Sequence, residues 1–203
     1  MKLSRKRTIQ INIIHLQFCI MKKQKIIIIT GNRGSGKTTL AYEYIDLLKR
    51  KDIKIGGVIT KSDDTKRYEN KFLYSVVDIL TNEEKELLTS VKPTEKSIKV
   101  GRFYMNLDAL SWANEKITAA SKICNALLID ELGPAELQGF GYARIAKELV
   151  NRYKGLIIFI VRIEILEQMR LFLHCSPETT IIVNAENSNK SNNQFIYKVL
   201  MNE

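Results

Sequence analysis

The sequence predicts a three-layer α/β/α fold with a mostly parallel sheet and an inserted antiparallel hairpin. Continuous apolar runs are typical of strands that are covered on both faces, and here they alternate with helical patterns along the 203 residues. The expected parallel strands are 25–30, 55–60, 126–130, 156–161 and 180–184. The expected helices are 37–50, 107–123, 135–153, 163–173 and, from a weaker pattern, 190–201.

The middle of the chain breaks this alternation. Residues 61–71 are a charged turn, and 72–79 and 97–105 are apolar stretches separated by a polar segment that contains Pro93. We therefore expect two or three antiparallel strands between the second and third parallel strands.

The first strand leads into a phosphate-binding motif. Residues 26–38 give four isoleucines, a glycine-rich loop and then Lys37 and Thr38 at a helix start, which is the Walker A pattern G-x-x-x-x-G-K-[ST] in its strand–loop–helix setting. Backbone N–H groups and the positive end of the helix would hold phosphate oxygens, Lys37 would reach the β- and γ-phosphates, and the Thr38 hydroxyl would ligate Mg²⁺. The alternative is an ordinary glycine-rich turn before a helix. The predicted phosphate-binding residues are Gly31, Asn32, Arg33, Gly34, Ser35, Gly36, Lys37, Thr38 and Thr39.

A second apolar run ends in two carboxylates. Residues 126–137 read ALLIDELGPAEL, so Asp130 closes the expected strand and Glu131 follows it. Ligands of open α/β sheets bind at the carboxyl ends of the strands, where Asp130 would serve Mg²⁺ and Glu131 would activate a water. The alternative is that Asp130 caps the next turn and Glu131 is only solvated. Together the two motifs predict a P-loop NTPase fold that binds a nucleoside triphosphate.

Two arginines and one lysine are further candidates. Arg162 follows the strand 156–161 and would stabilise transition-state charge from the carboxyl edge of the sheet, so the predicted catalytic residues are Glu131, Lys37 and Arg162. A surface arginine at a strand end is the competing interpretation. Arg33 lies in the loop and faces either phosphate or solvent, and Lys61 has a similar but weaker claim than Arg162.

The net charge of +10 is concentrated near the N-terminus. Seven of these charges lie in residues 1–25, which leaves +3 for residues 26–203 and argues against a nucleic-acid partner. No stretch approaches the roughly 18 apolar residues of a membrane span. We expect residues 1–20 to be a non-native or dispensable extension and residues 21–203, starting at Met21, to form a single domain.

Cysteine usage indicates the compartment. Cys19, Cys124 and Cys175 are scattered and odd in number, which favours a reducing, cytoplasmic setting. The sequence leaves the oligomeric state open, with a monomer as one option.

The stretch after the second apolar run resembles the I-D-E-[IL]-G-P-x-E-L signature of the small P-loop nucleoside-triphosphatases of archaea, bacteria and animals. Other segments are also similar to that family: 56–60 (GGVIT), 101–104 (GRFY) and 183–187 (VNAEN). The resemblance implies a Mg²⁺-dependent hydrolase that converts an NTP to NDP and phosphate with broad base tolerance. It departs from the family at Ser188, where an arginine is usual, and in residues 61–71, which lack glycine.

Two other functions remain open at this stage. A phosphoryl transferase would use the same loop but needs an acceptor pocket and several arginines, which Arg67, Arg102 and Arg162 could supply in part. A nucleic-acid-stimulated ATPase is the third possibility. Glu131 beside the metal-binding aspartate favours water as the acceptor and hence hydrolysis.

Overall fold

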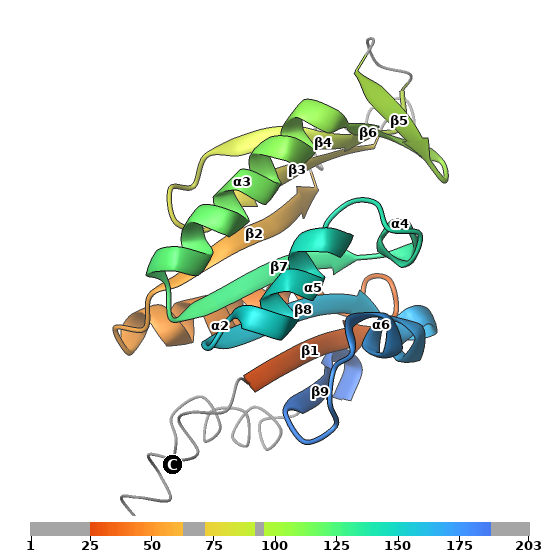
Figure 1. The fold of residues 1–203 in the computed structure, drawn as a ribbon. Coiled ribbons are helices and arrows are strands. Elements are labelled where there is room, and N and C mark those ends of the chain that lie inside the picture. The colour runs from red at the N-terminus through yellow and green to blue at the C-terminus, as the bar shows by residue number, and fades with distance from the viewer. Residues whose placement is uncertain (1–24, 63–71, 92–95, 188–203) are drawn as a thin grey trace, which may run out of the picture.

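A single mixed sheet organises the structure. The computed structural model describes residues 25–62, 72–91 and 96–187, and in these ranges the strands form one nine-stranded sheet with the order β5-β6-β4-β3-β2-β7-β8-β1-β9 (Figure 1). The five predicted parallel strands are confirmed and lie next to one another. They are β1 (Lys25–Gly31), β2 (Ile55–Ser62), β7 (Ala126–Leu132), β8 (Leu156–Arg162) and β9 (Thr180–Asn184).

An antiparallel wing extends the sheet beyond β2. It contains β3 (Leu73–Asp78), β4 (Glu84–Thr89), β5 (Ser97–Val100) and β6 (Phe103–Asn106). The prediction of two or three strands was too low, because β4 begins with the charged residues Glu84, Lys85 and Glu86 and forms through pairing with β3 rather than from apolar character. The apolar stretch 97–105 forms a tight hairpin of β5 and β6.

Helices cover both faces of the sheet and create two cores. α3 (Leu107–Ile123), α5 (Ala143–Arg152) and α6 (Leu166–Leu173) pack on one face, and α2 (Lys37–Arg50) packs on the other (Figure 1). Strand alternation divides β1 between them: Ile26 and Ile28 face the first core, whereas Ile27 and Ile29 face the second. This double burial explains why the parallel strands are continuous apolar runs.

The prediction of one continuous helix over 135–153 was wrong. The structure has a single turn, α4 (Pro134–Leu137), then a loop, then α5. The helix is interrupted because Gly141 has a φ of +63°, which is not helical. A side chain at this position would also collide with the carboxylate of Glu136. The helices expected at 37–50 and 107–123 are confirmed as α2 and α3, and 163–173 is a 3₁₀ turn (Ile163–Ile165) followed by α6.

Several expectations fall outside the described ranges. These are the helix at 190–201, the extension 1–20, most of the charged turn 61–71, and Arg67 and Ser188. Among the described helices, none is both long enough and apolar enough to cross a membrane.

Candidate functional site

The phosphate loop has the backbone that its motif predicts. α2 starts at Lys37, directly after Gly36, whose φ of +86° places it in the left-handed region. The first backbone N–H groups of a helix have no partner within the helix, so the amides at the start of α2 are available to an anion. The Lys37 ammonium group folds back over the loop and donates to the carbonyl oxygens of Gly31, at 3.0 Å, and Asn32, at 2.6 Å.

Glu186, which follows the edge strand β9, holds the phosphate loop by hydrogen bonds. One oxygen of this carboxylate, Oε1, accepts hydrogen bonds from the backbone N–H of Asn32, at 3.0 Å, and from its side-chain amide, at 2.6 Å. Glu186 is itself held by Asn184, whose Oδ1 accepts from the Glu186 N–H at 2.9 Å. Asn32 therefore anchors the loop through Glu186, a role that only the resemblance of residues 183–187 to a family motif could have suggested.

A β-bulge in β7 sets the two predicted carboxylates. Ile129 pairs with Phe159 of β8 and Leu132 pairs with Val161, so β7 contains one residue more than its partner over this stretch. Glu131 has a φ of +58°, an uncommon conformation for a residue other than glycine. The bulge interrupts the normal alternation of side chains, and both Asp130 and Glu131 line the same cavity.

Asp130 is fully buried. Its Oδ2 accepts a hydrogen bond from the backbone N–H of Thr60 at 2.9 Å, whereas Oδ1 has no hydrogen-bond partner within the described ranges. Burial raises the pKa of Asp130 to about 7, and the carboxylate of Glu131 adds to the shift.

These residues fit a magnesium ion. Oδ1 of Asp130 is a buried carboxylate oxygen without a partner in the described ranges, and such an oxygen is the hard ligand that Mg²⁺ prefers. Thr38, whose hydroxyl group could be a second ligand, lines the same cavity. Among the described residues no group of three or more His, Cys, Asp or Glu could hold a metal. Mg²⁺ commonly uses one or two protein ligands together with substrate phosphates.

Replacing Asp130 by asparagine is expected to stabilise the metal-free protein at pH 8 by about 1–3 kcal/mol. Because the pKa in the folded state lies above the ordinary value of 3.8, the ionised carboxylate lowers the free energy of unfolding progressively as pH rises from that value to about 7. Asparagine keeps an acceptor for the Thr60 amide and carries no charge. Urea unfolding in EDTA should show the gain at pH 8 and almost none near pH 4, and an equal gain at both would contradict this account.

One cavity of about 670 Å³ brings most of the predicted site together. Its lining comes from the phosphate loop, the start of α2, the ends of β2, β7 and β8, the segment through α4, and the antiparallel wing. The predicted residues that line it are Arg33, Gly34, Gly36, Lys37, Thr38, Thr39, Asp130, Glu131 and Arg162. Gly31, Asn32 and Ser35 are not in its lining, and Lys61 instead forms an ion pair with Glu84 at 3.5 Å.

The cavity contains charges of both signs. Burial lowers the pKa of Lys37, and Arg162 lowers it further, whereas Glu131 and Asp130 oppose the shift. Arg162 therefore lies close enough to Lys37 to share its electrostatic environment, as its place at the end of β8 predicted. The cavity lining includes the cations Arg33, Lys37, Arg102 and Arg162 and the carboxylates Asp130, Glu131 and Glu136, a combination suited to holding a polyanion beside a metal ion.

Glu136 fixes the segment that follows β7. Its buried carboxylate accepts hydrogen bonds from the backbone N–H groups of Gly133, at 2.7 Å, and Tyr142, at 3.0 Å, and burial raises its pKa. The two bonds close the loop around α4 on one side of the cavity. The residue types alone did not predict this role, although Glu136 lies in the stretch that resembles the family signature.

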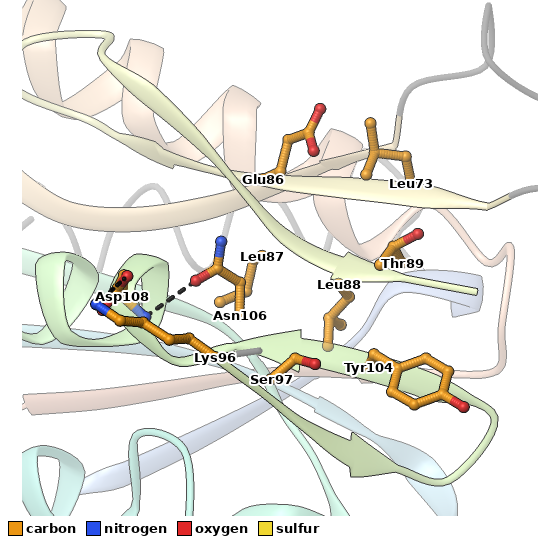
Figure 2. A pocket seen from close by; sticks show the side chains of 10 residues that line it. All are labelled: Leu73, Glu86, Leu87, Leu88, Thr89, Lys96, Ser97, Tyr104, Asn106 and Asp108. Atoms are coloured by element: carbon orange, nitrogen blue, oxygen red, sulfur yellow. Dashed lines mark hydrogen bonds and ion pairs between the residues drawn. The ribbon is translucent and has the colours of Figure 1, made fainter. Parts of the chain in front are cut away.

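A second cavity, of about 550 Å³, lies over the wing (Figure 2). Figure 2 shows Lys96 and Asp108 at one end, where they form an ion pair of 3.2 Å, and Tyr104 at the other. None of the residues predicted for the site lines this cavity.

Comparisons with known proteins agree on one family. A family model described as NTPase matches residues 26–196. The nucleoside-triphosphatase THEP1 of Methanocaldococcus jannaschii is 34% identical over 139 residues, which are 67% of this chain and 78% of that protein. The THEP1 of Sulfurisphaera tokodaii is 28% identical over 182 residues, 89% of this chain and 98% of that protein.

Two solved structures share the fold. The crystal structure of THEP1 from Aquifex aeolicus superposes with a TM-score of 0.61 at 18% identity, over 86% of this chain and 96% of that one. The solution structure of a human cancer-related nucleoside triphosphatase gives 0.62 at 18% identity, over 88% and 96%. The overall fold is thus common to all three.

Proposed function

Since this chain belongs to the NTPase family, we propose that it is a Mg²⁺-dependent nucleoside-triphosphatase that hydrolyses ATP, GTP and other NTPs to NDP and phosphate. The observation that carries the proposal is the single cavity that unites the phosphate loop, the buried Asp130 and the bulged Glu131. The names of the curated relatives support the same activity.

Each residue has a distinct task in this proposal. The loop amides and Lys37 hold the phosphates, while Thr38 and Asp130 hold Mg²⁺, which when bound would neutralise charge on the β- and γ-phosphates. Glu131 is exposed and lines the cavity next to Asp130 in the sequence, and in this proposal it takes a proton from a water. Arg162 stabilises the charge that develops on the transferred phosphoryl group.

The cysteines support the proposed cytoplasmic location. Cys124 and Cys175 are free thiols, and burial raises the pKa of both, to about 11 for Cys175. The buried Cys175 thiol is an inert structural group, and the half-buried Cys124 thiol is likewise free, so neither needs an oxidising compartment.

The test is phosphate release from each NTP with Mg²⁺. We expect phosphate release without any added acceptor, and we expect EDTA to abolish it, because the proposed reaction needs Mg²⁺ to neutralise charge on the β- and γ-phosphates. The same mixtures with nucleosides or nucleoside monophosphates added test the alternative. Phosphoryl transfer that occurs only when such an acceptor is present would show a transferase and overturn the proposal.

A further inference from the structure

The part of the main cavity farthest along the wing has a composition that phosphate binding does not explain. Tyr74, Arg102 and Phe103, here called the aromatic wall, line it. The rings of Tyr74 and Phe103 meet edge to face with centroids 5.5 Å apart, and the Arg102 guanidinium lies 4.9 Å from the Phe103 ring centroid. On its other side Arg102 lies 5.2 Å from the ring of Phe72.

The aromatic wall is only partly buried. Tyr74 and Phe103 are half-buried and Arg102 is exposed, whereas Tyr44 and Phe159 are almost completely enclosed in the two cores. Two ring surfaces and a guanidinium plane therefore border an accessible cavity instead of filling an interior. Such surfaces stack nucleobases, and the charge of arginine suits a phosphate beside them.

The sheet order places the aromatic wall on the β7 side of the phosphate loop. Starting from β1, which carries the phosphate loop, the strands run through β8 and β7 to β2 and then to the wing. Lys37 and Asp130, which we assign to the β- and γ-phosphates and to the metal ion, line the same cavity as the wall. We expect the wall to face the γ-phosphate end of a bound triphosphate, with the nucleoside on the α-phosphate extending away from β7.

A contact between the loop and the wall supports this placement. Arg33, from the loop, reaches the Tyr74 hydroxyl group with Nη2 at 3.5 Å. Arg33 and Arg102 both line the cavity, so a ligand on the rings would lie near two guanidinium groups. The combination of rings and guanidinium groups matches a nucleotide, which pairs a flat base with an anionic phosphate.

We propose that the aromatic wall binds a second nucleotide, with its base on Phe103 and Tyr74 and its phosphate on Arg102, while the triphosphate occupies the loop. The second nucleotide is either a free mononucleotide or one unit of a single strand, since both present the same base and phosphate. The proposal rests on the proposed function only in requiring a triphosphate in the loop.

Calorimetric titration of the full chain tests this. The protein is first saturated with Mg²⁺ and a non-hydrolysable ATP analogue, and then AMP, GMP, CMP, UMP or a single-stranded oligonucleotide of about eight residues is added. We expect saturable binding that Arg102→Ala and, separately, Phe103→Leu weaken by about 10-fold or more. Lys99→Ala is the matched control, because Lys99 is an exposed cation on the same hairpin that does not line the cavity.

The outcomes separate the ligand sources and the competing explanation. Binding of mononucleotides identifies a free nucleotide, and binding of the oligonucleotide alone identifies a strand. The proposal is overturned if neither ligand binds, or if Lys99→Ala weakens binding of the second nucleotide as much as Arg102→Ala does. It is also overturned if Arg102→Ala weakens binding of the ATP analogue, because the wall would then bind the base of the triphosphate. The titration does not measure hydrolysis, so its result can be interpreted even if the proposed function fails. Phe103→Leu keeps an apolar side chain at this position, so the variant is expected to fold.

Discussion

Replacing Glu131 by glutamine is expected to lower the rate of phosphate release by about 10²–10⁴-fold, the usual cost of losing a positioned general base. Glutamine has nearly the same shape, but its amide cannot take a proton from water. The proposed metal ligand Asp130 and the loop remain unchanged, so binding of Mg²⁺ and nucleotide should be preserved. Single-turnover phosphate release and fluorescent-nucleotide binding measure the two quantities separately.

A matched variant separates base catalysis from a change of charge. Glu164→Gln removes another carboxylate that acts electrostatically on Lys37 but does not line the cavity. Its phosphate release should stay close to that of the unmodified protein. A loss below about 10-fold in Glu131→Gln, or the same loss in both variants, would remove Glu131 from the role of base.

Lys37→Ala is expected to weaken nucleotide binding by about 10²-fold or more and to abolish measurable hydrolysis. The reason is that Lys37 supplies a cation at the centre of the loop, and hydrogen bonds to charged groups in such a site are the strong ones. Without a nucleotide, the partners of its ammonium group among the described residues are the carbonyl oxygens of Gly31 and Asn32, which are part of the loop itself. Equilibrium binding of a fluorescent nucleotide, followed by the phosphate assay, measures both effects.

Lys61→Ala is the corresponding control. Lys61 lies at the end of the neighbouring strand β2 but pairs with Glu84 and does not line the cavity. Its removal should leave affinity within about twofold, because exposed ion pairs contribute little. Binding that survives in Lys37→Ala would show that the loop does not hold the phosphates in the proposed way.

Local signals were sufficient for most of the fold. The parallel strands could be predicted because burial on both faces requires apolar residues throughout, as in Ile26–Ile29. The start of α3 is similarly local, since the side chain of Asn106 caps the helix by accepting from the N–H groups of Asp108, at 3.0 Å, and Ala109, at 3.2 Å. By contrast, β4 could not be predicted, because pairing with β3 and not its own composition makes it a strand.

The site shows the same division between local and distant causes. The loop, Asp130, Glu131 and Arg162 could be expected at one edge because parallel strands end at a common side of the sheet. The bulge in β7 depends on its register with β8, which the sequence of one strand does not contain. The anchoring of Asn32 by Glu186 joins residues that are 154 positions apart, so no local pattern could reveal it.

The bulge in β7 has a consequence for how the site could be regulated. Because Asp130 and Glu131 are successive residues of one strand and line the same cavity, the proposed metal ligand and the proposed general base share one short stretch of main chain. A displacement of that stretch relative to α2 would shift both carboxylates together. The rate of hydrolysis would then depend on a single distance, the one between the end of β7 and the start of α2.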